Sequence, residues 1–208
     1  MPGKQHFKAQ DSKVEGDWSQ AAFWTVGGAL GAGITASGVD FASLQGDKAV
    51  VEIMQRMGAD IAKNADSVTV NSGATQATII DASDCPDIIP VLTVLAAVSE
   101  GTTKIINAGR LRIKECDRLA AMTSELNKMG AAITEEPEGL TIIGKPDGLR
   151  GGVEADAWND HRIAMSLAIA AQCCAEPITL TGAGSVSKSY PDFWQDYQSV
   201  GGKIEVLA

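Results

Sequence analysis

The stretch IIPVLTVLAAV, residues 88–98, is apolar around its whole circumference apart from one threonine. A helix of this composition has no polar face to turn toward water, so it belongs in the interior of a fold. The stretch IAMSLAIAAQCC, residues 163–174, has the same character. Both are shorter than the roughly 20 residues that a membrane-spanning helix needs. The sequence therefore predicts buried helices in a globular fold and no membrane segment.

Three similar units follow one another along the chain. The tripeptides MGA, MGA and VGG stand at residues 57–59, 129–131 and 200–202, at intervals of 72 and 71 residues. Each unit opens with a polar turn and an apolar helix. These opening segments are residues 16–31, 84–99 and 158–174. A fixed period of this length is typical of structural repeats, so we expect three units of one design.

Segments that are predicted to form strands complete each unit. A short β-branched segment follows the apolar helix, as at residues 103–106 and 178–181, and an amphipathic helix comes next. Further strands are predicted at residues 132–134 and 140–143, and the dipeptide Glu138-Gly139 between them indicates a hairpin. Each unit therefore has roughly the order βαβαββ, which places the chain in the α/β class.

Length and charge restrict the possible partners. The chain has 208 residues and a net charge of −9, which suits one domain with a sizeable core. An acidic protein with scattered basic residues is not attracted to nucleic acid or to an anionic membrane surface. Small anions remain possible ligands, because a local basic pocket can exist in an acidic protein.

The cysteines and histidines indicate neither disulfides nor a metal site. The two histidines, His6 and His161, are far apart, so a zinc site would need scattered carboxylates as further ligands. No CxxC pair occurs, and reduced thiols suit the cytoplasm. The four cysteines are Cys85, Cys116, Cys173 and Cys174. We expect a cytoplasmic protein without a metal ion.

The segment RLRIKECDR, residues 110–118, places four cations and two carboxylates within nine residues. Apolar residues then recur at helical spacing, so residues 114–118 lie at a helix start. Unpaired N–H groups at a helix start favour anions, and Lys114 and Arg118 would add full charges. The alternative is a solvated helix end with surface ion pairs.

Two further segments carry charge next to apolar runs. In NDHRIAM, residues 159–165, Arg162 stands at the start of a buried helix and needs a partner or a ligand. The alternative for this segment is an Asp160–Arg162 pair that caps the helix. Lys188 lies in SVSKSYPDFW, residues 185–194, and taken alone it reads as a surface lysine.

Five segments together resemble the 5-enolpyruvylshikimate-3-phosphate synthase family in order and spacing. They are VEGDWSQAAF at 14–23, DCPDIIP at 84–90, RIKECDRL at 112–119, NDHRIAM at 159–165 and SKSYPDFW at 187–194. This family, the target of glyphosate, joins phosphoenolpyruvate to shikimate 3-phosphate in aromatic amino acid biosynthesis. The resemblance covers essentially the whole chain, but only the second half of the family's sequence.

The resemblance implies an inside-out α/β domain of three βαβαββ-type repeats, with buried helices and outer sheets. Residues 1–208 would form a single C-terminal domain, with the N-terminal domain of the same enzyme absent. In the family an N-terminal segment crosses over to finish this domain, so strands are expected to be missing and an edge exposed. MPGKQHFKAQ, residues 1–10, reads as the tail of a strand that begins upstream, and Met1 would open a fragment.

The family's catalytic roles fall on two carboxylates. Asp87 matches the group that contacts the shikimate hydroxyls and accepts the proton of the attacking hydroxyl. Glu115 matches the acid that protonates the methylene carbon of phosphoenolpyruvate. A proton donor needs a raised pKa, whereas Lys114 and Arg118 beside Glu115 would lower it, and the sequence leaves that conflict open.

The family's binding roles fall on basic residues. Arg118 and Arg162 match the pair that holds phosphoenolpyruvate, since a planar guanidinium suits a carboxylate. Lys114 would meet shikimate 3-phosphate and Lys188 would meet phosphoenolpyruvate. Arg110 stands where some members place an asparagine that touches the shikimate phosphate.

Supporting roles are implied for the neighbours of these residues. Asp160 and His161 would orient Arg162 and form the wall of the anion site. Asp17 and Asp47 occupy comparable turns in the first unit, where we expect them to cap helices. The implied reaction proceeds through a tetrahedral intermediate and needs no cofactor.

Two other functions remain open at this point. An enolpyruvyl transferase acting on UDP-N-acetylglucosamine has the same fold and phosphoenolpyruvate chemistry, although RIKECDRL and NDHRIAM favour the shikimate enzyme. A non-catalytic anion-binding or assembly domain would suit a chain that lost its partner lobe. Because half of the cleft would be missing, we expect this chain alone to be inactive.

Overall fold

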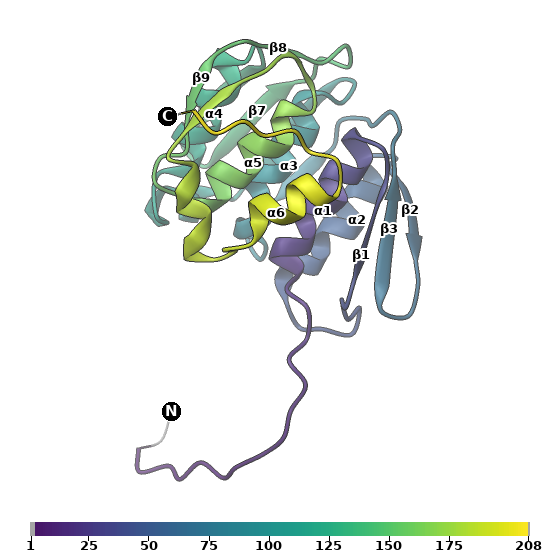
Figure 1. Cartoon of the computed structure of the whole chain (residues 1–208), viewed down its shortest axis with the longest axis vertical. Helices are drawn as coiled ribbons and strands as arrows, with labels where there is room; N and C mark the ends of the chain where they lie inside the picture. Colours follow the sequence, from purple (N-terminus) through teal and green to yellow (C-terminus); the bar gives the residue numbers. More distant parts are fainter. Residues whose placement is uncertain (1–2, 208) are drawn as a thin grey trace.

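Three buried helices form the centre of the protein, of which a computed structural model describes residues 3–207. They are α1 (Trp18–Leu30), α3 (Ile89–Ala97) and α5 (His161–Ala171). Every residue of α3 is buried, and so are ten of the eleven residues of α5 and ten of the thirteen of α1. The three helices contact one another in pairs and lie inside the molecule (Figure 1). The apolar stretches of the sequence are therefore core helices, as predicted.

The first two units share one sheet topology on the outside of these helices. The first unit contains β1 (Ile34–Ser37), α2 (Ala49–Arg56), β2 (Asp60–Lys63) and β3 (Ser67–Asn71). The second contains β4 (Ile79–Asp81), β5 (Thr102–Ile106), α4 (Arg118–Lys128), β6 (Ala132–Glu136) and β7 (Gly139–Ile143). The first sheet has the order β1-β3-β2 and the second β4-β5-β7-β6. Strands β6 and β7 form the expected antiparallel hairpin, and β1 to β3 lie on one outer face (Figure 1).

The third unit is shorter than predicted. It contains β8 (Leu149–Gly151), β9 (Glu154–Asp156), β10 (Cys174–Glu176), β11 (Thr179–Thr181) and α6 (Phe193–Ser199). Its strands form two parallel pairs, β10 with β8 and β11 with β9. Residues 203–207 form no strand, so the final ββ pair of this unit is not made within the described part of the chain.

The first unit lacks the strand that should precede α1. One hydrogen bond recurs in all three units, from Ala82 N to Ile106 O, from Ala157 N to Thr181 O and from Gly16 N to Gly38 O. Before the first two donors the chain forms β4 and β9, but residues 3–17 form no strand. The expectation that residues 1–10 end a strand is therefore wrong for the described residues, and residues 1 and 2 lie outside them.

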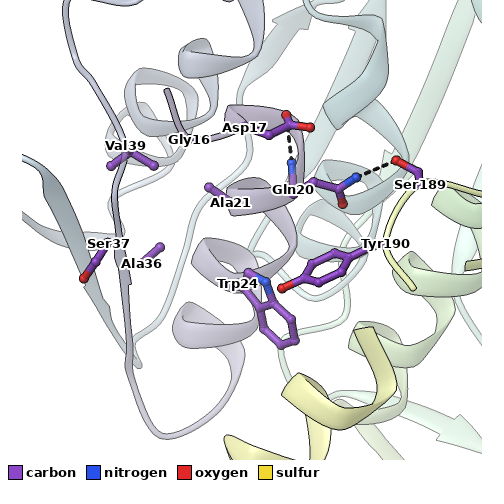
Figure 2. A pocket seen from close by; sticks show the side chains of 10 residues that line it. All are labelled: Gly16, Asp17, Gln20, Ala21, Trp24, Ala36, Ser37, Val39, Ser189 and Tyr190. Carbon is purple, nitrogen blue, oxygen red and sulfur yellow. Dashed lines mark hydrogen bonds between the residues drawn. The ribbon is translucent and has the colours of Figure 1, made fainter. Parts of the chain in front are cut away.

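A groove of about 410 Å³ lies along α1 beside this open edge of β1. Its walls come from α1, β1 and the loop before α6, and Figure 2 shows Trp24 and Tyr190 lying close together at one end of it. Gln20 Nε2 donates to Ser189 Oγ at 2.7 Å across the groove. This contact ties the first unit to the segment that carries Lys188.

Short 3-10 turns precede α2, α3, α4 and α6. These turns are η1 (Gly46–Lys48), η2 (Pro86–Ile88), η3 (Gly109–Ile113) and η4 (Ala183–Lys188). Aspartates at the N-cap positions, Asp17, Asp117 and Asp160, then accept backbone amides and start α1, α4 and α5. Among the described residues, no helix is both long and apolar enough to cross a membrane.

Candidate active site

Arg118 lies at the centre of a buried charge cluster at the start of α4. Its side chain is 1% exposed. It donates to three carboxylates, from Nε to Asp160 Oδ2 at 2.8 Å, from Nη1 to Asp87 Oδ1 at 2.8 Å and from Nη2 to Glu115 Oε2 at 2.7 Å. Three charged segments that are distant in sequence therefore meet at one guanidinium.

The cluster keeps its charges because each one is paired. Burial alone would lower the pKa of Arg118, but the hydrogen bond and charge of Asp160 outweigh burial and raise it. Burial would likewise raise the pKa of Asp160, which is 0% exposed, yet the hydrogen bond and charge of Arg118 bring the net shift downward. Both groups are thus ionised at neutral pH, as a buried pair with satisfied hydrogen bonds can be.

Asp87, the expected proton acceptor, lies in η2 between three cations. Lys114 Nζ is 3.1 Å from its Oδ1, and Arg162 Nη2 is 3.6 Å from its Oδ2. Burial pushes the pKa of Asp87 up, but the charges of Arg162, Lys114 and Arg118 make the net shift downward. The carboxylate is ionised and its side chain is 29% exposed, so it is open to a ligand.

Arg162 enters the same site from the start of α5 and is 7% exposed. Its Nη1 donates to the backbone oxygen of Asp87 at 3.3 Å, and its Nη2 donates to Ser19 Oγ at 3.0 Å. Asp160 does cap α5, because its Oδ1 accepts from Arg162 N at 2.8 Å, but its side-chain ion pair is with Arg118. The proposed Asp160–Arg162 pair is therefore a backbone cap and not a side-chain ion pair.

Glu115 and His161 form the side of the site nearest Asp160. The Glu115 side chain is 41% exposed, and its Oε1 lies 4.0 Å from His161 Nδ1. Burial and the charge of Arg162 lower the pKa of His161, so this side chain is neutral near pH 7. The other oxygen, Glu115 Oε2, accepts from Arg118 Nη2 at 2.7 Å, so Glu115 lies between His161 and Arg118.

Lys188 and Arg110 lie outside the cluster. Lys188 Nζ donates to the backbone oxygen and to Oδ1 of Asn159, at 2.5 and 2.8 Å. It is therefore placed beside the start of α5, one residue from Asp160. The side chain of Arg110 is exposed and makes no hydrogen bond or ion pair with any of the described residues. The structure thus brings together all the expected site residues except Arg110, with Lys188 at the border.

The two aspartates of the first unit have different roles. Asp17 caps α1 as expected, accepting from Ser19 N at 2.8 Å and Gln20 N at 3.4 Å. The expected cap role of Asp47 is wrong, because the chain turns into η1 before α2 and places Asp47 inside that turn. Its Oδ1 is buried and has no partner among the described residues. Burial and the nearby charge of Asp87 raise the pKa of Asp47 to about 6.

Ser19 is a site residue that the sequence did not reveal. It lies two residues after the cap Asp17 and is 5% exposed, and its hydroxyl contacts Arg162 from a different unit. No local pattern marks a serine at this helix position as a partner of an arginine 143 residues away. Only the packing of α1 against α5 creates the contact.

The site has features that favour anionic ligands. It combines Lys114, Arg118 and Arg162 with the first turns of α1, α4 and α5, where the positive ends of the helix dipoles favour negative charge. Residues 3–207 hold no group of three histidine, cysteine or carboxylate side chains arranged to bind a metal ion.

Comparison with solved structures identifies the class of the fold. EPSP synthase from Acinetobacter baumannii superposes with a TM-score of 0.85 and 31% sequence identity, over 94% of this chain and 48% of that chain. The enolpyruvyl transferase NikO from Streptomyces tendae superposes with a TM-score of 0.74 over 92% of this chain, and at 22% identity it shows the fold alone. The fold is that of the enolpyruvyl transferases.

Sequence comparison identifies the family within that class. A family model described as EPSP synthase (3-phosphoshikimate 1-carboxyvinyltransferase) matches residues 1–197. The chain belongs to the EPSP synthase family. The 3-phosphoshikimate 1-carboxyvinyltransferases of Clostridium kluyveri and Clostridium beijerinckii are 53% and 54% identical to it, each over 99% of this chain. The chain spans about half the length of these curated relatives, 48% and 47%.

Proposed function

We propose that this chain is the C-terminal half of an enzyme that transfers the enolpyruvyl group of phosphoenolpyruvate to the 5-hydroxyl of shikimate 3-phosphate, with release of phosphate. The observation that carries this proposal is the cluster of Asp87, Arg118 and Arg162, which joins an ionised carboxylate to two nearly buried guanidinium groups. Relatives that are 53% and 54% identical to this chain carry the name of that activity, 3-phosphoshikimate 1-carboxyvinyltransferase.

The geometry supports separate binding roles for the basic residues of the site. Arg162 would bind the carboxylate of phosphoenolpyruvate through parallel hydrogen bonds, with Arg118 and Lys188 beside it. Lys114 would bind the phosphate of shikimate 3-phosphate. Such fixed charges lower the barrier by positioning both substrates and stabilising the anionic intermediate.

Asp87 and Glu115 would move the protons of the reaction. Asp87 would take the proton of the 5-hydroxyl as its oxygen bonds to C2 of phosphoenolpyruvate, and Glu115 would deliver a proton to the methylene carbon. In the elimination step Glu115 would take a proton back from the methyl group, the C–O bond to phosphate would break as the double bond re-forms, and the proton held by Asp87 would leave with the phosphate. Glu115 would be freed for these steps when an anionic ligand takes its place on Arg118.

The second half of the enzyme is the proposed partner of this domain. Residues 3–207 carry one wall of charged groups, and the rest of the cleft would come from the N-terminal domain. That half would also supply the strand missing from the third unit. In the second unit the strand order is β5-β7-β6. By analogy, the missing strand of the third unit would lie between β11 and residues 203–207. In this proposal the whole chain acts as a single domain in the cytoplasm, where its free cysteines stay reduced.

Phosphate release tests the proposal. The chain alone, and the chain mixed with the N-terminal half of the Clostridium kluyveri relative, would each receive phosphoenolpyruvate and shikimate 3-phosphate. We expect release only from the mixture, and none when Asp87→Ala replaces the native chain. Lys104→Ala, at an exposed lysine of β5, serves as the control and should leave the rate unchanged.

Three results would contradict the proposal. Release by the chain alone would show that the second half is not needed. Release with UDP-N-acetylglucosamine as acceptor, and not with shikimate 3-phosphate, would assign the other transferase activity. No release from a mixture whose two halves demonstrably associate would favour a non-catalytic domain.

A further inference from the structure

The two arginines of the site are held in different ways. Arg118 donates to three carboxylates at 2.7 to 2.8 Å, so its charge is fully compensated. The nearest carboxylate oxygen to Arg162 is Asp87 Oδ2, at 3.6 Å from Nη2. The shortest contact of the Arg162 guanidinium is with a neutral group, the hydroxyl of Ser19, at 3.0 Å. Arg162 is thus nearly buried with its nearest carboxylate, that of Asp87, at ion-pair distance but not hydrogen-bonded to the guanidinium.

The Ser19 hydroxyl has a fixed direction. Its oxygen donates its proton to Asp17 Oδ1 at 2.6 Å, so a lone pair faces Arg162 Nη2. Asp17 Oδ1 is itself held by the backbone N–H groups of Ser19 and Gln20 at the start of α1. The guanidinium is therefore held through a hydroxyl anchored on a helix cap, and neither group has room to rotate freely.

We propose that Ser19 is a positioning residue for Arg162, which aims the guanidinium at the carboxylate of phosphoenolpyruvate without cancelling its charge. This inference rests on the proposed function. A hydrogen bond from a guanidinium to a neutral oxygen orients the group and leaves its net charge available to the ligand. A carboxylate at the same place would orient Arg162 equally well but would compete with the substrate.

The number of N–H donors that Arg162 keeps free agrees with this role. A guanidinium has five N–H donors in one plane. In this site one Nη1 donor goes to the backbone oxygen of Asp87 and one Nη2 donor goes to Ser19. The remaining donors are available to a planar anion. Because Ser19 belongs to α1 and Arg162 to α5, the contact also fixes the first unit against the third.

The first test observes Arg162 directly in this chain. Side-chain NMR signals of the Arg162 guanidinium, assigned by their loss in Arg162→Lys, should be resolved in the native protein at low temperature and collapse in Ser19→Ala. The matched control is Ser99→Ala, because Ser99 is 1% exposed, donates to Leu95 O at 2.8 Å and lies 2.7 Å from Thr75 Oγ1. Unchanged Arg162 signals in a folded Ser19→Ala protein would overturn the inference.

The second test measures kinetics in the mixture with the N-terminal half. Ser19→Ala should raise KM for phosphoenolpyruvate about tenfold, as expected for one lost charge-assisted hydrogen bond, with kcat and KM for shikimate 3-phosphate nearly unchanged. Ser19→Thr, which keeps the hydroxyl, should restore KM. Ser19→Asp should raise KM further, because it neutralises Arg162.

A double-mutant comparison separates positioning from general damage. If Ser19 acts through Arg162, Ser19→Ala should have no further effect on KM in an Arg162→Lys background. An undiminished effect in that background, or an equal rise of both KM values, would overturn the inference. If the native mixture releases no phosphate, the proposed function fails and the substrate role of Ser19 fails with it. The NMR result then still decides whether Ser19 anchors Arg162.

Discussion

Replacing Asp160 with alanine should be among the most damaging single changes in this chain. Asp160 is 0% exposed and accepts from Arg118 Nε at 2.8 Å and Nη2 at 3.3 Å. It also accepts the backbone amide of Arg162 at 2.8 Å as the cap of α5. Asp160→Ala therefore removes a buried ion-pair partner and a helix cap together.

The size of the loss follows from these two contacts. Removing one partner of a buried pair costs about 3–5 kcal/mol, and losing an aspartate cap adds about 1 kcal/mol. Asp87 and Glu115 still neutralise Arg118, which places the expected total near the low end, at about 4 kcal/mol. That is a large part of the roughly 5–15 kcal/mol that stabilises a typical domain.

Urea unfolding of the chain followed by circular dichroism measures this loss. Asp117→Ala is the matched control, because Asp117 caps α4 and its side chain is 33% exposed. It should lose only about 1 kcal/mol. If Asp160→Ala lost no more than Asp117→Ala, the buried pair with Arg118 would contribute nothing net and the reasoning would be refuted.

The pH dependence gives an independent check on Asp160. Its pKa in the folded chain is below the ordinary aspartate value of 3.8, so the native chain gains stability from its ionised form above that value. The gain is lost as the pH falls through the lower folded pKa. The stability difference between the native chain and Asp160→Asn should therefore be constant from pH 5 to 7 and shrink in stronger acid. A difference that grows in acid would contradict the assigned charge state.

Three further changes test other parts of the structure. The pKa of Asp47 is about 6, against 3.8 in the unfolded chain, so the native chain loses stability as the pH rises from 3.8 to about 6, and the loss is complete above that pH. Asp47→Asn should therefore stabilise the chain by about 1–2 kcal/mol at pH 7.5 and far less at pH 4, as unfolding at the two pH values will show. Burial raises the pKa of the Cys116 thiol to about 12, so iodoacetamide at pH 7.5 should alkylate Cys116 far more slowly than a free thiol. Mass spectrometry measures the rate, and fast labelling of Cys116 would contradict a buried thiol. A methyl group on Gly144 would overlap the backbone oxygen of Ser99, so Gly144→Ala should lower the free energy of unfolding by about 1–3 kcal/mol. Urea unfolding measures this loss, and an unchanged midpoint would show that the backbone relaxes at this position.

The sequence by itself determined the local elements and their repetition. Residues 88–98 and 163–174 had to be buried because they have no polar face, and α3 and α5 are accordingly the most buried helices. The spacing of the Met-Gly-Ala turns also gave the three units. These features depend only on neighbours along the chain, and so they can be predicted without the fold.

Strand pairing was only partly predictable. The hairpin of β6 and β7 has both strands in one segment and formed as expected. The segments before α1 and after α6 have strand-like sequences but form no strand. A strand needs a neighbour to bond its backbone groups, and for these two segments no neighbour is present among residues 3–207.

Only the tertiary structure decided which charges meet. From sequence, Asp160 and Arg162 were candidates for a pair, yet Asp160 pairs with Arg118 because α4 and α5 start side by side. Likewise Asp47 had the sequence of a cap, but it became a partly buried carboxylate whose Oδ1 has no partner among the described residues. Ion pairs join residues that are distant in sequence, and their energies depend on a few ångströms of separation and on burial, which the order of residues alone does not specify.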